Sequence, residues 1–154
     1  MSPSARLAQL GIALPEAFAP LAHYVPAVRT GNLVFTSGQL PREDGKLART
    51  GKLGAEVSPE DGKAAARVCA LNALAAIDSL VGIDAVTRVV KVVGFVASAP
   101  GFNGQPNVVD GASDLLAEVF GDKGAHARSA IGVAELPLDT PVEVELIVEV
   151  GQRP

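Results

Sequence analysis

The chain has 154 residues, of which 48% are hydrophobic and 19% charged, and its formal net charge at pH 7 is −4. A chain of this length can build one domain with a substantial core, and we expect a single domain over residues 1–154. The acidic balance gives no long-range attraction to nucleic acid or anionic membranes. With no signal-peptide pattern and no run of about 18 apolar residues, we expect a soluble, cytoplasmic protein.

Residues 1–26 form a predicted lead-in to the domain. Leucines at helical spacing within Ser4–Leu10, followed by Gly11, predict a short helix. The Pro-rich segment Leu14–Pro26 then predicts an extended backbone.

Turn and loop signals dominate the next part of the chain. Gly31 and Asn32 predict a turn before a short strand over Leu33–Ser37. The polar, Gly-rich residues Pro41–Val57 show no sustained periodicity, so they predict a surface loop.

Two helices flank a long β-branched run. Ser58 can accept a hydrogen bond from a free backbone N–H, and Pro59 suits the first helical position, so they predict a helix that runs to Val81. The continuous run Val86–Val96 predicts a strand buried on both faces. A second helix is predicted over Asp110–Phe120.

The last two predicted strands alternate with period 2. Ala127–Ala134 and Val142–Val150 each present one face to the interior, and we expect the valine-rich face to be the buried one. Arg128 and Glu143 should then share the opposite face of one sheet. If the two strands pair about the Pro137–Pro141 turn, Glu143 lies level with a residue six positions beyond Arg128, roughly 20 Å away. Arg128 and Glu143 of one chain would then serve different sites.

The order strand, helix, strand, helix, strand, strand predicts an α/β (α+β) fold, with one mixed sheet covered on one face by two helices. We expect the uncovered face to contain Ala130, Gly132 and Ile147. A soluble monomer would not normally expose such an apolar patch, so this face requires a partner.

Three segments carry a resemblance to a known family. TGNLVFTSGQLP (Thr30–Pro41), ARSAIGVAELP (Ala127–Pro137) and VEVE (Val142–Glu145) resemble the signature segments of the YjgF/YER057c/UK114 family, also called RidA, reactive-intermediate deaminase or endoribonuclease L-PSP. The resemblance implies a chorismate mutase-like fold. It also implies a homotrimer with ligand clefts at the subunit boundaries.

The resemblance assigns the main chemistry to two residues. Arg128 would hold the carboxylate of a small 2-imino or 2-enamino acid, which suits the planar guanidinium fork. Glu143 would orient the attacking water, and a carboxylate can also accept its proton. Such hydrolysis yields a 2-keto acid and ammonia, and we expect it to need no cofactor and no metal.

Further cleft positions follow from the same resemblance. Tyr24 would line the cleft, and Ser37 and Gly38 would meet a polar part of the ligand. Ala130 stands where many members have cysteine, which leaves a backbone contact but no thiol. The connection Ala97–Val109 is longer and richer in Gly and Pro than is typical of the family. It offers two candidates for the cleft asparagine, Asn103 and Asn107.

The remaining reactive side chains predict no additional site. Cys69 lies in a helical pattern and is expected to be a buried apolar residue. His23 and His126 are expected to be partly exposed surface residues, and the sequence has no metal-ligand spacing.

Three functions are compatible with these observations. We favour an imine or enamine deaminase, a hydrolase that removes reactive by-products of other enzymes. A non-catalytic trimer that binds small carboxylates, with a regulatory role, would use the same Arg128 cleft. An endoribonuclease or translation inhibitor is the least favoured, because the chain is acidic and lacks a basic patch with interleaved aromatics.

Overall fold

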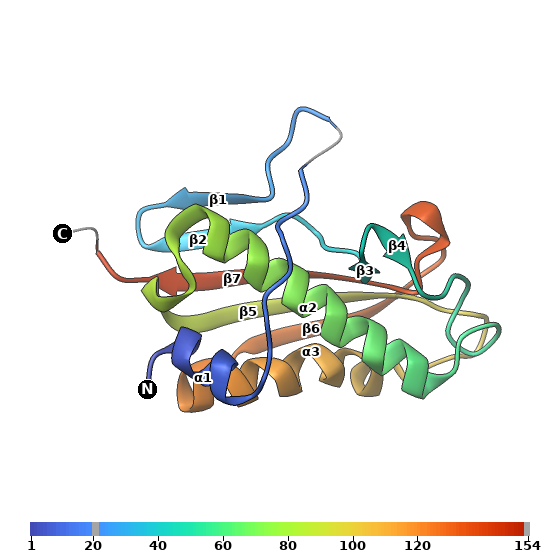
Figure 1. Cartoon of the computed structure of the whole chain (residues 1–154). Helices are drawn as coiled ribbons and strands as arrows, with labels where there is room; N and C mark the ends of the chain where they lie inside the picture. Colours follow the sequence, from blue (N-terminus) through green and yellow to red (C-terminus); the bar gives the residue numbers. More distant parts are fainter. Residues whose placement is uncertain (20–21, 153–154) are drawn as a thin grey trace.

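The computed structural model describes residues 1–19 and 22–152, which form one five-stranded sheet with helices against it (Figure 1). The strand order is β1-β2-β7-β5-β6, and a separate hairpin pairs β3 with β4. The strands are β1 (Ala27–Thr30), β2 (Leu33–Thr36), β3 (Arg42–Glu43), β4 (Lys46–Leu47), β5 (Val86–Ala97), β6 (Ala127–Val133) and β7 (Val142–Val150). The α-helices are α1 (Pro3–Gln9), α2 (Pro59–Val81) and α3 (Gln105–Phe120), with short 3-10 turns η1 (Ile83–Ala85), η2 (Gly121–Gly124) and η3 (Pro137–Asp139).

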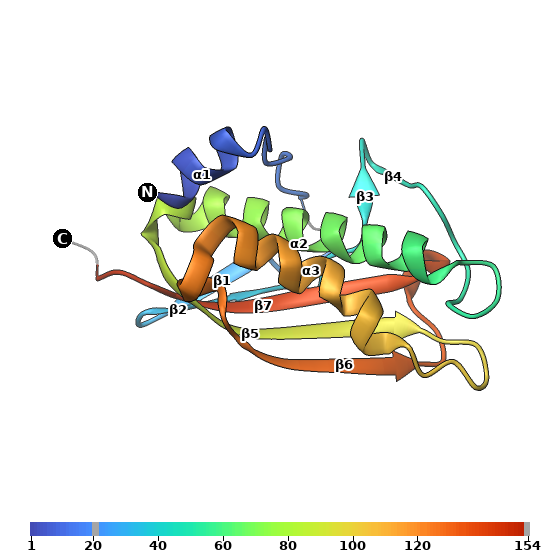
Figure 2. The same ribbon diagram turned by 90° about the horizontal axis from the view of Figure 1, so that it is seen from below.

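Figure 2 shows α2 and α3 on one face of the sheet, and no described element covers the other face. The predicted mixed sheet with two helices on one side is therefore confirmed. The pairing of β5 with β6 is parallel, whereas the β1–β2, β2–β7 and β5–β7 pairs are antiparallel.

The predicted pairing of the last two strands is wrong, because β5 lies between β6 and β7. The α3 crossover from β5 places β6 parallel to β5 at the edge of the sheet. The connection that contains η3 then carries the chain past the end of β5, and β7 pairs with its other side.

Helix α2 begins and ends where its sequence signals predict. The Ser58 hydroxyl accepts a hydrogen bond from the Asp61 backbone N–H at 3.1 Å, and Gly82 follows the last turn with φ 81°. By length and composition alone, this 23-residue helix could span a membrane, but half of its most apolar stretch is buried in the protein. It is the central helix of the core.

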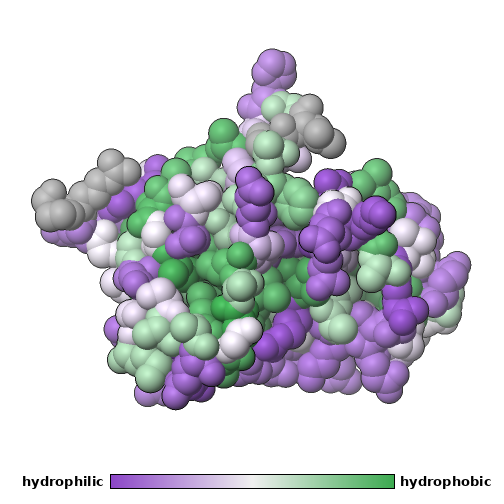
Figure 3. Space-filling model, viewed as in Figure 1, coloured by the Kyte–Doolittle hydropathy of each residue, from purple (hydrophilic) through white to green (hydrophobic). Residues whose placement is uncertain are grey.

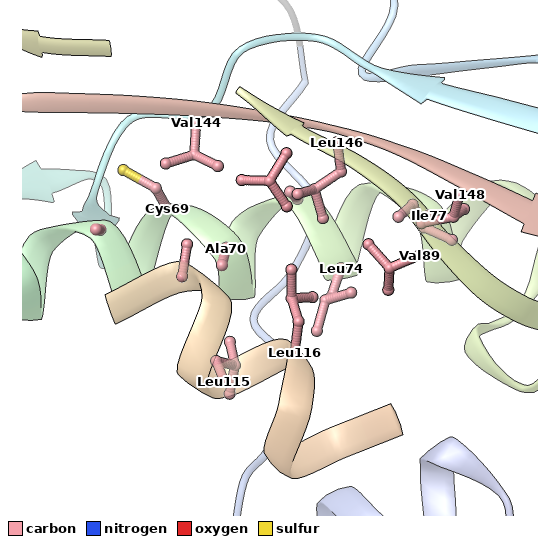
Figure 4. Close-up of a cluster of buried hydrophobic side chains, with 14 of the residues drawn as sticks. Cys69, Ala70, Leu74, Ile77, Val89, Leu115, Leu116, Val144, Leu146 and Val148 are labelled. Atoms are coloured by element: carbon pink, nitrogen blue, oxygen red, sulfur yellow. The ribbon is translucent and has the colours of Figure 1, made fainter. Parts of the chain in front are cut away.

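The core is a layer of aliphatic side chains between the helices and the sheet (Figure 4). Leu74 and Ile77 of α2 and Leu116 of α3 pack against Leu146 and Val148 of β7, and all five are buried. Cys69 joins this layer as a fully buried side chain, as predicted, and burial raises the pKa of its thiol well above the usual range.

Several element boundaries differ from the prediction. Helix α3 begins at Gln105, five residues earlier than predicted, because its Pro106 occupies the first turn, where proline needs no N–H partner. The connection that looked unusually long is therefore only residues 98–104. Strand β1 and the β3–β4 hairpin were not predicted, since their short runs lie among Gly, Pro and charged residues.

The uncovered face carries both apolar and charged side chains, and its residues are not all those predicted. Phe35 and Ile131 are 40% and 44% exposed there. Ile147 belongs to this face, as expected, and is level with Phe35, whereas Ile131 lies nearer to Glu143. Ala130 and Gly132 instead face the helices: Ala130 packs against the core, and a Cβ at Gly132 would meet Gln105 of α3. On the opposite side, Figure 3 shows hydrophilic and hydrophobic side chains interspersed over the helix layer.

We predict that Gly111→Ala destabilises the protein. A Cβ at Gly111 of α3 would lie far inside van der Waals contact with the backbone carbonyl of Lys63 in α2. Overpacking of this kind costs about 1–3 kcal/mol or more, whereas Ala in place of Gly in an open helix would stabilise by about 1 kcal/mol. Urea unfolding should show a lower free energy of unfolding for the variant. A higher value would contradict the close contact between α3 and α2 at Gly111.

The control is Gly151→Ala, because only the Thr87 side chain lies within 4.0 Å of its added Cβ. This variant should change stability by less than about 0.5 kcal/mol.

Candidate functional site

Arg128 and Glu143, the two residues predicted to carry the chemistry, lie on opposite faces of the sheet, which corrects the prediction that they share one face. Arg128 is level with Val92 on β5, and Val92 is fully buried toward the helices. Glu143 is level with Phe95, which lies three residues further along β5 and so points to the uncovered face. The predicted offset is also wrong, because Arg128 and Glu143 are three residues apart along the sheet and two strands apart across it, roughly 10 Å in each direction.

Arg128 reaches from the edge strand β6 to one face of α3. Its Nη1 donates to Asp110 Oδ1 at 2.7 Å and to Ser113 Oγ at 3.2 Å, and Nη2 makes a long contact of 3.4 Å to the Pro106 carbonyl. The side chain is 24% exposed. No described residue accepts a hydrogen bond from Nε, so the edge formed by Nε and Nη2 remains available to a carboxylate.

A hydrogen-bond chain extends this cluster to His126. Ser113 Oγ accepts from Arg128, so its own proton is free to be donated to His126 Nε2, which lies 2.9 Å away. His126 Nδ1 lies 2.6 Å from the Gly124 carbonyl, which can only accept. The neutral histidine therefore carries its proton on Nδ1, and His126 supports the position of Ser113 rather than lying free on the surface.

Sequence reasoning missed Asp110 and Ser113. The available signal was their spacing with Pro106, which places all three on one helical face once the early start of α3 is known. The sequence prediction began this helix at Asp110, so Pro106 was left outside it and the helical face that the three residues share was not recognised.

Glu143 occupies a different environment on the uncovered face. Its carboxylate lies where a Cβ of residue 38 would be, so glycine at position 38 leaves room for this position of the carboxylate and a larger residue would displace it. Burial, and to a smaller degree the negative charge of Glu145, raises the pKa of the Glu143 carboxyl. No described residue donates a hydrogen bond to this carboxylate, which leaves both oxygens free to bind water or a ligand.

Gly38 also borders a cavity of about 90 Å³ beside the end of β2. Tyr24 lines this cavity and is 57% exposed. Ser37 does not line it, and the Ser37 hydroxyl donates to the Val25 carbonyl at 2.6 Å. The structure thus brings Tyr24, Gly38 and Glu143 together, with Ser37 adjacent in the chain. The lining residues are Phe18, Ala19, Tyr24, Pro26, Gly38, Gln39, Leu40 and Arg42.

The other candidates lie outside this cavity. Ala130 belongs to the Arg128 side of the sheet, and Asn103 and Asn107 are both exposed, one before α3 and one in its first turn. His23 is exposed. Within residues 1–19 and 22–152, no three His, Cys, Asp or Glu side chains are grouped as a metal site would require.

Comparison with known proteins identifies the class. Residues 4–150 match the family described as "YjgF/chorismate mutase-like, putative endoribonuclease". The chain is 47% identical over 150 residues to Protein TCP17 of Trypanosoma cruzi, covering 96% of this chain and 94% of that protein. It is 32% identical over 137 residues to a 2-iminobutanoate/2-iminopropanoate deaminase of Dermatophagoides farinae, covering 89% and 93%.

A solved structure agrees with these relatives. The protein Atu1372 of Agrobacterium tumefaciens, of unknown function, is 44% identical and superimposes with a TM-score of 0.89, covering 97% of this chain and 92% of that one. The chain therefore belongs to the YjgF/chorismate mutase-like family. The resemblance of its signature segments predicted this membership correctly.

We predict that Glu143→Gln stabilises the protein at neutral pH. Because folding raises the pKa of Glu143, its ionised form opposes folding above that pKa, and the penalty is absent below the ordinary glutamate pKa. The free energy of unfolding of the variant should exceed that of the wild type at pH 7. The difference should vanish by about pH 3, well below the ordinary glutamate pKa, where the carboxyl is neutral in both the folded and the unfolded chain.

The matched control is Glu149→Gln, an exposed glutamate on the same face of β7. Its effect should be within about 0.5 kcal/mol at both pH values. An equal gain from both variants would show that net charge, and not the environment of Glu143, is responsible.

Proposed function

We propose that the protein is a cytoplasmic homotrimer that hydrolyses small 2-imino and 2-enamino acids to 2-keto acids and ammonia. The observation that carries the proposal is the placement of Arg128 and Glu143 on opposite faces of one sheet. One subunit cannot present both side chains to one small ligand. A second copy, with the uncovered face of its sheet against the β6 edge of the first, could supply the missing partner.

The two side chains suit the two ends of the reaction. The Nε and Nη2 edge of Arg128 would bind the substrate carboxylate and place its C=N bond beside Glu143 of a neighbouring subunit. Glu143 would orient water toward the imine carbon and accept its proton, and the raised pKa makes it a stronger base than an ordinary glutamate. The tetrahedral intermediate then loses ammonia as its nitrogen is protonated.

Two observations support hydrolysis over the alternatives. A trimer that only binds carboxylates would need Arg128, but it gives no role to the partly buried Glu143, whose oxygens accept no hydrogen bond from described residues. Similarity to a protein named as an imine deaminase also supports turnover. A ribonuclease would have to bind RNA, a polyanion, and this protein itself has a net charge of −4, which disfavours such binding.

We predict a trimer in solution. The uncovered face exposes Phe35 beside Ile147 and, further along the sheet, Ile131, and a subunit contact over this face would remove these large apolar side chains from water. Light scattering should give three times the subunit mass of 15.7 kDa at micromolar concentration. A stable monomer under those conditions would defeat the proposal.

We predict that Arg128→Ala and Glu143→Gln complement one another. Each variant alone should lose nearly all turnover of 2-aminoacrylate, and Arg128→Ala should also lose binding of 2-keto acids. Subunits of the two variants, unfolded together and reassembled, should recover part of the activity, because some clefts would combine one intact residue from each chain.

Arg128→Lys is the matched control for charge, and it should be nearly as inactive as Arg128→Ala because the planar fork is lost. Activity that stays absent in mixed trimers would mean that both residues of a site come from one chain. Full activity of Arg128→Ala would remove Arg128 from the mechanism.

A further inference from the structure

The cavity beside Gly38 is lined by a positively charged side chain, Arg42, that has no role in the proposed reaction. Arg42 is the charged residue among the cavity's lining residues, and it follows Gly38 by four positions. It is partly buried, and no described residue accepts a hydrogen bond from its guanidinium or pairs with it as an ion. The other described arginine that makes no such contact, Arg88, is exposed.

The guanidinium of Arg42 lies near an aromatic ring. Its carbon is 5.6 Å from the centre of the Phe18 ring, within the range of a cation–π contact. No described residue accepts a hydrogen bond from the guanidinium, so its N–H groups are available to donate. Such an arginine can meet a carboxylate with two parallel hydrogen bonds.

The backbone that carries Arg42 is held from two sides. Asn72 of α2, which is 2% exposed, donates from its amide to the carbonyls of Leu40 and Arg42 at 2.9 and 3.0 Å. Gln39 exchanges both backbone hydrogen bonds with Val144 of β7, next to Glu143. The cavity wall is therefore built by the core helix and by the strand that carries the proposed base.

We propose that Arg42 binds a second carboxylate of the substrate, so that the preferred substrates are dicarboxylic 2-imino acids of four or five carbons. This inference rests on the proposed function. Gly38 lies against the Glu143 carboxylate and also borders the cavity that Arg42 lines. In this proposal the substrate's imine carbon faces Glu143, and its far end occupies that cavity and meets Arg42. Arg128 of the neighbouring subunit would hold the carboxylate next to the imine carbon. Arg42 is then the specificity-determining residue.

The test compares two five-carbon probes that differ in one carboxylate, 2-oxoglutarate and 2-oxopentanoate, by calorimetric titration of the full-length protein. The wild type should bind 2-oxoglutarate about tenfold or more tightly. Arg42→Gln should reduce that ratio to about one, and Arg42→Lys should give an intermediate ratio, since it keeps the charge but not the fork. Arg49→Gln, which removes an exposed arginine paired with Asp61 outside the cavity, should keep the full ratio.

Two results would overturn the inference: a wild type with no preference between the probes, or an Arg42→Gln variant that weakens both by the same factor. Its failure can be told from failure of the deaminase proposal by assaying the matching imines. Turnover of the monocarboxylic imine without any preference would reject the Arg42 site and keep the deaminase. Arg42-dependent binding of 2-oxoglutarate without turnover of either imine would keep the site and reject the deaminase.

Discussion

The packing of α2 and α3 against one valine-lined face of the sheet determines to which side of the sheet Arg128 and Glu143 point. Strand residues alternate between faces, so burial of Val142, Val144 and Leu146 sends Glu143 and Glu145 to the uncovered face. The same packing sends Arg128 to the helix side, because β6 takes its register from β5. A register slip of one residue in β6 or β7 would exchange these positions, and the fully buried valines prevent it.

Strong local signals allowed much of the fold to be predicted from sequence. Ser58, Pro59 and the Gly at position 82 fix the ends of α2, and the alternating valines of β7 identify its buried face. The neighbour of each strand could not be predicted in the same way. Whether β6 lies beside β7 or beside β5 depends on the α3 crossover, which is a long-range feature that no local pattern records.

The small residues on the Arg128 face of β6 were correctly grouped on one face, but that face was assigned to the wrong side of the sheet. Ala130 and Gly132 are small, and small residues suit close approach of a ligand or subunit, but here they make room for α3. Ile131, on the other parity, has the larger apolar side chain and yet is exposed in the isolated chain. The composition of β6 did not distinguish its two faces, because small residues suit close packing by a helix of the same chain as well as by a ligand or a second subunit.

Arg128 and Glu143 differ in how far the rest of the chain compensates their charges. Arg128 already has a carboxylate partner in Asp110, and a partly exposed pair of this kind contributes only about 1 kcal/mol, so a ligand carboxylate can add to it at the free edge without first breaking it. Glu143 has no such compensation for its burial. An uncompensated, partly buried carboxyl group packed against a glycine adds nothing to the stability of the fold, and perturbed groups of this kind are enriched at functional sites, which supports the role proposed for Glu143.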